Sequence, residues 1–404
     1  MIRNSIKALV TVIPQMSEMV KGLRDMAKKG DQRAFYDILY EHLNMWQTVP
    51  IKLAVIGESG SGKSSFINAL RGISEDDEDA AEVGVTETTT TVRDYPHQTH
   101  KNLVLYDLPG VGTSKFPKES YLEKINVDQF DFFIVVSSKR FKDNDMWIAK
   151  EINRRKKKFY FVRTMIDIDV YNDSRKKNRK GRPQDTMNQV REDIQCQLSN
   201  EFEVVPHIFL ISNHDTDKFD FSKLTIQMVN DTASGKRDAF VFALTHPSND
   251  MIGKKSDVLA KRIERLAYAS AMTALIPLPG VNRLFDIIII QNELKFYKEQ
   301  FGTDEQSIKN INEKFDISFD GIFEYNSSML LRSTSMLYDF IFEKGRNPKK
   351  ERRNVVLKIV RGLLGNRVGA YKACKNSLHD LLAMCTNGAM VLNAHIVDKV
   401  YPDQ

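Results

Sequence analysis

Residues 51–72 read IKLAVIGESGSGKSSFINALRG, and this stretch decides which fold the sequence predicts. The apolar run Ile51–Ile56 leads into Gly57-Glu58-Ser59-Gly60-Ser61-Gly62-Lys63-Ser64, and a helix-forming run starts at Ser65. The middle part matches the pattern GxxxxGK[ST] without a gap. That pattern forms a phosphate-binding loop when a strand precedes it and a helix follows, as is predicted here. We therefore expect residues 57–65 to hold the phosphates of a nucleotide.

The composition of this loop explains how it would bind phosphate. Its glycines let successive backbone N–H groups point inward at phosphate oxygens, and the start of the following helix adds a partial positive charge. Lys63 is expected to reach the β- and γ-phosphates, where it serves both binding and catalysis. The Ser64 hydroxyl can enter the ligand shell of Mg²⁺.

A second motif, Asp107-Leu108-Pro109-Gly110, follows the apolar run Leu103–Tyr106. It has the DxxG form found in GTPases, in which the aspartate holds Mg²⁺, usually through water, and the glycine N–H senses the γ-phosphate at the start of a mobile switch. Four such residues also suit an ordinary turn after a strand. Because a phosphate loop precedes them by 44 residues, from Lys63 to Asp107, we predict that Asp107 holds Mg²⁺ and that Gly110 senses the γ-phosphate.

The segment between these motifs is rich in threonine. Residues 84–91 read GVTETTTT, which offers five threonines. A GTPase needs one threonine here that binds Mg²⁺ and the γ-phosphate together. The residues alone do not choose among the five, and an exposed loop or sheet edge accounts for the others.

Guanine recognition requires a carboxylate that accepts hydrogen bonds from the base. Thr164 and Asp167 form a TxxD element directly after the apolar run Phe159–Val162, and we predict that Asp167 selects guanine over adenine. Asp169 is close enough to be an alternative. Met165 stands where the motif usually has lysine, so the apolar cover of the base is kept but the ammonium is lost. Weaker or less selective nucleotide binding is therefore expected.

One further contact to the base is predicted at the end of the apolar run Ile208–Ile211. Ser212 and Asn213 come directly after this run, at a place where a backbone N–H normally contacts the guanine oxygen. The cofactors that these motifs predict are GTP or GDP together with Mg²⁺.

The order of apolar runs predicts the fold class. Short, nearly continuous runs suit strands buried on both faces, and the intervals between them are long enough for helices. We predict an α/β domain with a mostly parallel sheet and helices on both faces, followed by helices only. The expected domains are N-terminal helices at 1–48, a nucleotide-binding domain at 49–235 and a helical domain at 236–404, with both helical ends packing together. The later helices are expected at 255–275, 282–301, 304–316, 317–344, 352–372 and 376–399.

Composition and charge exclude several classes. Lys+Arg exceeds Asp+Glu by 59 to 53, which permits contact with anionic surfaces without requiring it. The basic clusters lack interleaved aromatic residues, so no nucleic-acid partner is expected. The three widely spaced cysteines predict neither a disulfide framework nor a zinc site. No run of apolar residues is long enough to span a membrane, and Ile2, in place of glycine, predicts no N-myristoyl anchor.

Taken together, these segments resemble the immunity-related GTPases, an interferon-inducible family that includes cytosolic effectors against vacuolar pathogens. The resemblance covers most of the chain from 50 to 300 and is weaker in the last hundred residues. It implies a Ras-like GTPase domain flanked by a helical domain built from both termini. Besides the phosphate loop, the similar segments are GVTETTTT (84–91), YPH (95–97), LYDLPGVGTSKFP (105–117), residues 130–138, FYFVRTMID (159–167) and ALIPLPGVN (274–282).

The resemblance implies roles for particular residues. Lys63 places the chain with the members that carry lysine rather than methionine before the loop serine. Thr89 is implied as the switch threonine that binds Mg²⁺, and Glu87 as a catalytic group near the γ-phosphate in a nucleotide-facing dimer. No glutamine follows the DxxG motif, where Val111-Gly112 stand, so the water-orienting group must come from Glu87 or from a partner subunit. We therefore predict slow hydrolysis by the monomer and activation by self-association into a homodimer or oligomer.

Contact with intracellular membranes is the family's other property. Residues 354–371 combine an apolar run with Lys358, Arg361 and Arg367, which suits a basic amphipathic helix at a membrane interface. The same pattern also fits a helix that packs into the helical domain. The resulting expectation is a cytoplasmic protein, peripherally associated with intracellular membranes, that acts as a dynamin-like effector of cell-autonomous immunity.

Two other functions remain open from the sequence. A GTP-gated interaction scaffold with little hydrolysis and a non-immune role fits the missing glutamine and Met165. A GTPase associated with RNA or ribosomes is the lesser alternative, because no RNA-binding strand set follows the nucleotide-binding domain.

Overall fold

The computed structural model describes residues 32–83, 91–112, 115–175, 182–244, 248–273, 281–315 and 370–400. The chain divides into two compact units. The α/β unit comprises residues 47–251, and the helical unit combines residues 1–46 with residues 252–404. Both ends of the chain therefore belong to one unit, although the whole α/β unit separates them in the sequence.

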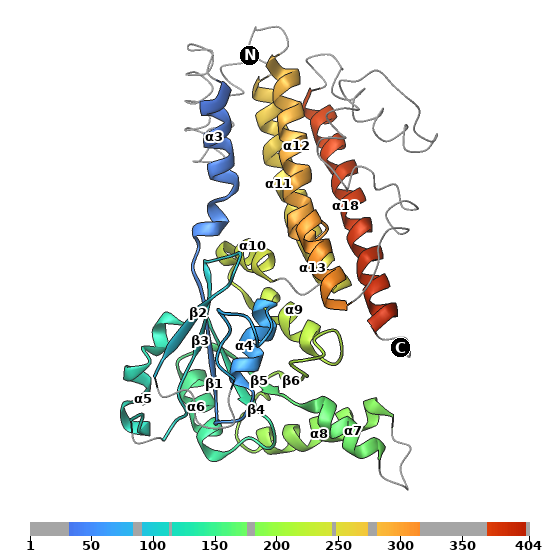
Figure 1. The fold of residues 1–404 in the computed structure, drawn as a ribbon. Helices are drawn as coiled ribbons and strands as arrows, with labels where there is room; N and C mark the ends of the chain where they lie inside the picture. The colour runs from blue at the N-terminus through green and yellow to red at the C-terminus, as the bar shows by residue number, and fades with distance from the viewer. Residues whose placement is uncertain are drawn as a thin grey trace. The chain divides into compact units, whose positions relative to one another are not determined.

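A six-stranded sheet forms the centre of the α/β unit (Figure 1). Its strand order is β2-β3-β1-β4-β5-β6, and every neighbouring pair is parallel except β2 and β3. Strand β1 lies between β3 on one side and β4 on the other, so the parallel strands after β1 are added first on one side and then on the other. The carboxyl ends of β1, β3 and β4 therefore meet at a switch point, where ligands of such sheets bind. The strands are β1 (Ile51–Gly57), β2 (Arg93–Pro96), β3 (Leu103–Asp107), β4 (Phe132–Ser137), β5 (Lys158–Arg163) and β6 (Ile208–Leu210).

Helices cover both faces of this sheet. Successive residues of a strand point to opposite faces, and on β4 the ring of Phe132 stacks on Phe240 while Phe133 joins a core cluster with Tyr121. Phe66 packs near Phe221. The helices of the α/β unit are α4 (Lys63–Arg71), α5 (Lys118–Lys124), α6 (Asp143–Arg154), α7 (Ile166–Ser174), α8 (Pro183–Ser199), α9 (Phe221–Asp231) and α10 (Ser234–Ala243).

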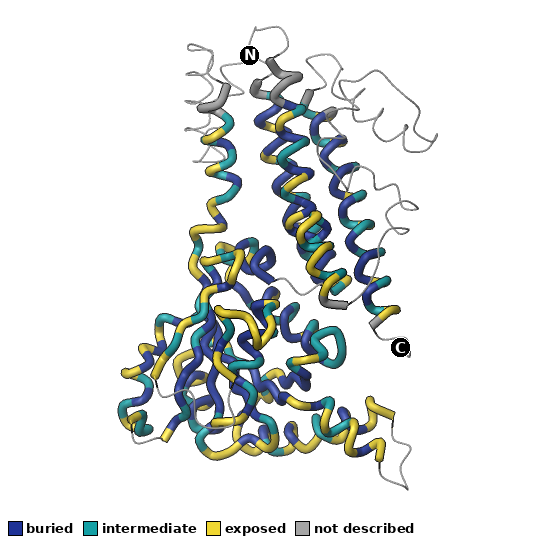
Figure 2. The backbone as a smooth tube through the Cα atoms, in the orientation of Figure 1, coloured by how far each residue is buried: buried dark blue, intermediate teal, exposed yellow. Residues whose placement is uncertain are grey.

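The central strands are buried along nearly their whole length, as Figure 2 shows in dark blue. Every residue of β4 is buried, and Leu53 of β1 pairs with Leu105 of β3 and Phe132 of β4. The nearly continuous apolar runs are therefore explained by helices on both faces. The sequence did not predict β2, whose residues alternate between half-buried and exposed at the sheet edge.

The boundary between the units differs from the predicted one. The α/β unit ends at Met251 rather than at 235. The reason is α10: Phe240 stacks on Phe132 with ring centroids 5.9 Å apart, and Lys236 forms an ion pair with Asp131 at 2.8 Å. Helical sequence after the last strand can therefore belong to the sheet's own cover.

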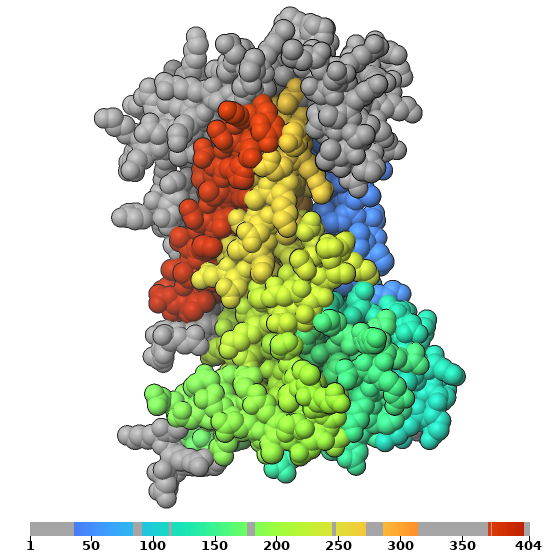
Figure 3. Space-filling model, turned by 180° about the vertical axis from the view of Figure 1, so that it is seen from behind, coloured from blue at the N-terminus to red at the C-terminus, as the bar shows by residue number. Residues whose placement is uncertain are grey.

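Long helices form the described part of the helical unit. In Figure 3, seen from behind, α18 lies against α11, and Thr386 of α18 donates a hydrogen bond to Ser256 of α11 at 3.3 Å. Lys375 of α18 also pairs with Glu264 of α11. The elements are α3 (Gln32–Leu43), a 3-10 turn at Met45–Thr48, α11 (Asn249–Thr273), α12 (Val281–Phe301), α13 (Glu305–Phe315) and α18 (Ala370–Val400).

Three of the expected later helices correspond to α11, α12 and α13. The expected break between 372 and 376 is wrong, because α18 is continuous and buries Cys374 and Leu378 on one face without a glycine or proline between them. The helices expected within 1–31, at 317–344 and at 352–369 lie outside the described residues. Within the described ranges, no helix is both long and apolar enough to cross a membrane.

Candidate nucleotide-binding site

The loop between β1 and α4 has the backbone shape that its glycines predict. Gly60 and Gly62 have φ of +72° and +87°, a left-handed conformation that favours glycine. A Cβ atom added to Gly57 would lie 2.2 Å from the carbonyl oxygen of Val136 on β4, so no larger residue fits there. Helix α4 starts at Lys63, which places its free N–H groups at the loop.

The loop lysine and serine face acceptors within the site. Lys63 is buried, and its Nζ donates to the carbonyl oxygen of Glu58 at 3.0 Å, across the curl of the loop. The Ser64 hydroxyl donates to Oδ2 of Asp107 at 3.3 Å. Asp107 is buried at the carboxyl end of β3. The two predicted metal-binding oxygens thus converge, and a hydroxyl beside a carboxylate is a donor set that suits Mg²⁺ next to phosphate.

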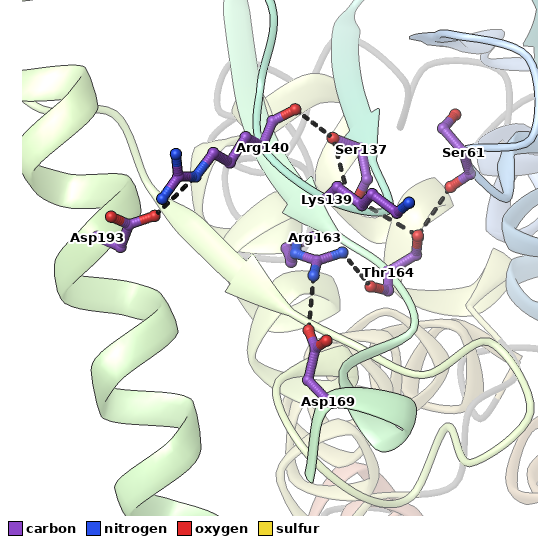
Figure 4. Close-up of polar contacts among 8 residues, drawn as sticks. All are labelled: Ser61, Ser137, Lys139, Arg140, Arg163, Thr164, Asp169 and Asp193. Carbon is purple, nitrogen blue, oxygen red and sulfur yellow. Dashed lines mark hydrogen bonds and ion pairs between the residues drawn. The ribbon is translucent and has the colours of Figure 1, made fainter. Parts of the chain in front are cut away.

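Thr164 ties the predicted base-recognition loop to the phosphate loop (Figure 4). Its Oγ1 donates to the carbonyl oxygen of Ser61 at 2.8 Å and lies 3.4 Å from that of Ser137. Asn213 makes a second link, because its Nδ2 donates to the carbonyl oxygen of Gly62 at 3.1 Å. Residues that follow two strands, β5 and β6, therefore hold the phosphate loop, and the structure brings these predicted residues together.

Arg163 and Asp169 bracket the TxxD element. Arg163 ends β5, and its Nη2 donates to Oδ2 of Asp169 at 2.6 Å. Burial lowers the pKa of Arg163, and Asp169 opposes that shift. Because Asp169 is held in this ion pair, the geometry disfavours it as the alternative guanine ligand.

Asp167 lies in the first turn of α7. No described residue forms a hydrogen bond or ion pair with its carboxylate. Met165, two residues earlier, has φ of +58° and is 37% exposed. An exposed apolar side chain beside a free carboxylate is the arrangement that the guanine-binding prediction requires.

The side chain of Ser212 stabilises a turn in the loop after β6. The Ser212 hydroxyl accepts hydrogen bonds from the backbone N–H groups of His214 and Asp215 at 3.3 and 3.2 Å. The Ser212 side chain therefore shapes the loop, which leaves its predicted contact with the base to the backbone.

Two side chains that the sequence did not single out hold the DxxG turn. Tyr121 of α5 donates its hydroxyl hydrogen to the carbonyl oxygen of Pro109 at 2.8 Å. Asn144 of α6 donates from Nδ2 to the carbonyl oxygen of Val111 at 2.9 Å. No motif marks either residue, because both lie in other elements and act only through their positions in the fold.

A charged group also links the phosphate loop to the start of α6. Lys142 Nζ lies 2.5 Å from Oε2 of Glu58, and this partner raises the pKa of Lys142. Asp145 accepts a hydrogen bond from the Lys142 N–H at 3.0 Å, and burial raises the pKa of Asp145 to about 6. The Glu58–Lys142 ion pair therefore joins the phosphate loop to the start of α6 at the surface.

The predicted residues Glu87 and Thr89 lie outside the described residues, so their positions stay predictions. Gly110 lies at the end of the DxxG turn, after β3, and Ser65 follows Ser64 in the first turn of α4. Within the described ranges, no group of three or more His, Cys, Asp or Glu residues forms a metal cluster.

A phosphate loop after the first parallel strand, an aspartate facing its serine and a TxxD loop bound to it define a P-loop GTP-binding protein. The model of the interferon-inducible GTPase family matches residues 16–380. The chain therefore belongs to this family, whose members bind GTP and GDP and hydrolyse GTP.

Curated relatives agree with this assignment. The chain is 36% identical to interferon-inducible GTPase 1 of Mus musculus over 73% of this chain and 71% of that protein. It is 34% identical to interferon-gamma-inducible GTPase 10 of Mus musculus, over 75% and 72%. Interferon-inducible GTPase 5 of Rattus norvegicus is 32% identical, over 75% of this chain and 66% of that protein.

Proposed function

We propose that this protein hydrolyses GTP slowly as a monomer and faster after self-association, and that it acts at intracellular membranes as an immunity effector. The observation that carries the hydrolysis proposal is the site around Lys63, where Ser64, Asp107 and Thr164 converge on one phosphate loop. Self-association is supported by the residues after the DxxG motif, Val111-Gly112, which lack a side chain able to orient water.

The residues of the chain divide the work of binding. Lys63 neutralises charge on the β- and γ-phosphates, and Asp167 accepts from the guanine ring with Met165 covering its face. Ser64, Asp107 and Thr89 would hold Mg²⁺, which when bound neutralises charge that develops on the transferred phosphoryl group. Gly110 donates its N–H to the γ-phosphate. Glu87, or a residue of a second copy, orients the attacking water.

The decisive experiment measures GTP turnover per molecule as a function of protein concentration. We expect specific activity to rise with concentration for GTP and not for ATP, because assembly supplies the missing water-orienting group. Lys63→Ala is the blank, and Glu87→Ala should lose the rise but keep nucleotide binding. Constant specific activity across the concentration range would contradict activation by assembly.

A second candidate function is a GTP-gated scaffold with a non-immune role. The absence of glutamine after Gly110 favours it, since such a protein needs to bind GTP but not to hydrolyse it. If the protein is such a scaffold, it should bind GTP and show no GTP turnover at any protein concentration.

Membrane contact is proposed for residues 354–371, where Lys358, Arg361 and Arg367 interrupt an apolar run. The test is co-sedimentation of the full chain with vesicles of neutral lipid alone and with added anionic lipid. Binding that requires anionic lipid and falls with salt supports an interfacial basic helix. Binding to RNA without binding to vesicles would favour the RNA-associated alternative.

A further inference from the structure

The peptide group between Pro109 and Gly110 has a side-chain partner on its carbonyl oxygen. Tyr121 of α5 is completely buried, and its hydroxyl donates to the Pro109 oxygen at 2.8 Å. A trans peptide group is planar, so its C=O and N–H point in opposite directions. By fixing the carbonyl of Pro109, Tyr121 therefore also fixes the direction of the Gly110 N–H.

Without this bond, the same peptide group would be free to turn. Its rotation depends on ψ of Pro109 and φ of Gly110; proline fixes only its own φ, and glycine restricts φ very little. Within the part of the chain that the structure describes, no residue accepts a hydrogen bond from the Gly110 N–H. The Tyr121 hydroxyl is thus the hydrogen-bond donor that restrains this peptide from outside the turn.

Tyr121 is itself held rigidly. Its ring meets Phe116 and Trp147 edge to face, with centroids 6.1 and 6.5 Å away. Burial, with a smaller effect of Asp107, raises the pKa of the phenol, so its hydroxyl stays protonated and keeps donating. Two residues beyond Pro109, the carbonyl of Val111 is held separately by Asn144.

We propose that Tyr121 is a positioning residue that aims the Gly110 N–H at the γ-phosphate and so sets the preference for a nucleoside triphosphate over a diphosphate. This inference rests on the proposed function, in which Gly110 donates to the γ-phosphate. A donor that is already aimed loses little orientational freedom when the anion binds. A hydrogen bond accepted by the carbonyl also polarises the N–H of the same peptide.

The test replaces Tyr121 with phenylalanine, which keeps the ring and removes only the hydroxyl. Binding is measured for a non-hydrolysable GTP analogue and for GDP, which needs no turnover. We expect the affinity of Tyr121→Phe for the analogue to fall about tenfold, as for partial loss of a hydrogen bond to a charged group, with GDP affinity nearly unchanged. In single turnover, the rate of GTP cleavage should fall as well.

Tyr160→Phe is the matched control. Tyr160 is also a buried tyrosine of the α/β unit, and its hydroxyl donates to Asp231 at 2.8 Å. The Tyr160→Phe variant should lower thermal stability about as much as Tyr121→Phe does. It should leave the ratio of the affinities for the GTP analogue and for GDP unchanged. Asn144→Ala, which frees Val111 but not the Pro109–Gly110 peptide, should change that ratio less than Tyr121→Phe.

The results separate the inference from the proposed function. If the unchanged protein binds both nucleotides and Tyr121→Phe weakens both equally, or neither, the positioning role is wrong and the proposed function stands. If the unchanged protein binds neither nucleotide, the proposed function is wrong, and the inference is overturned with it.

Discussion

At the scale of single residues, hydrogen bonds over long sequence separations assemble the site. Thr164 reaches Ser61 across 103 positions, and Asn213 reaches Gly62 across 151. Each bond ends on a backbone carbonyl of the phosphate loop, and one such hydrogen bond contributes about 0.5–1.5 kcal/mol to stability. One position, Met165, departs from the residue usual in its motif and allows a direct test of nucleotide affinity.

Met165→Lys should raise the affinity for GDP by a few-fold. The position is 37% exposed, so a lysine stem can cover the base as methionine does while its ammonium adds an attraction to the phosphate loop. The measurement is a GDP titration by fluorescence or calorimetry at physiological salt. Ile168→Lys is the control, because Ile168 is exposed directly after Asp167, and this substitution adds the same charge at a position where the motif has no lysine. An equal gain in both variants would contradict a specific role for residue 165.

At the scale of elements, helix α12 carries a carboxylate that the apolar pattern alone would not place inside. Asp286 is buried, and its Oδ1 accepts a hydrogen bond from Ser270 of α11 at 2.5 Å. Burial raises the pKa of Asp286 to about 6, and the Ser270 hydroxyl opposes the shift. Nearby on α18, burial and then Asp286 raise the pKa of the Cys374 thiol, which therefore stays neutral.

The stability of α12 is expected to rise as pH falls toward 5. The pKa of Asp286 is higher in the folded chain than in the unfolded one. The stabilisation that the protonated carboxyl of Asp286 gives to the folded state is therefore fully present below the unfolded pKa and is lost as pH rises through about 6. Asp286→Asn should remove this dependence and stabilise the helix at pH 7.5 by about 1–2 kcal/mol. Hydrogen exchange of α12 peptides between pH 5 and 7.5, corrected for intrinsic rates, measures it.

Asp398→Asn is the control, since Asp398 is exposed near the end of α18. This variant should keep the pH dependence of the unchanged protein. Protection of α12 that weakens on acidification in the unchanged protein would have the wrong sign and would count against the assignment.

At the scale of the whole molecule, a buried ion pair joins the beginning of the described chain to its later helices. Arg262 of α11 donates from Nε to both oxygens of Glu293 on α12, at 3.1 and 2.9 Å. It also donates to the carbonyl oxygen of Leu43 at the end of α3, at 2.9 Å, and to Asn44 at 3.1 Å. Its guanidinium lies 4.4 Å from the centroid of Phe296. This one side chain therefore links three helices of the helical unit.

Arg262→Ala should destabilise the helical unit by about 3–5 kcal/mol, because it leaves the carboxylate of Glu293 buried and unpaired. The double variant Arg262→Met, Glu293→Leu removes both charges with similar volume and should recover most of that loss. Urea unfolding followed by helical circular dichroism gives the stabilities, and limited proteolysis reports whether α3 is released. Equal destabilisation in the single and double variants would show that packing, rather than the unpaired charge, dominates.

Much of the site could be predicted from the sequence because its chemistry depends on local spacing. The phosphate loop, Asp107 and the TxxD element each sit directly after an apolar run, and parallel strands bring those ends together. Tyr121 and Asn144 could not be found in this way, since they contact the DxxG turn from α5 and α6. Strand β2 was missed because an edge strand with one neighbour needs no continuous apolar run.

The sequence by itself determined the α/β class of the nucleotide-binding domain, the strands that carry continuous apolar runs and the place of the phosphate loop after β1, because backbone curl and strand ends follow from local residue order. Only the tertiary structure decided that α10 completes the cover of the sheet through Phe240, that Asp169 is held by Arg163 and Asp167 is not, and that a tyrosine holds the Pro109 carbonyl. Each of these contacts joins groups of different elements or turns, so it depends on how those elements pack rather than on spacing along the chain.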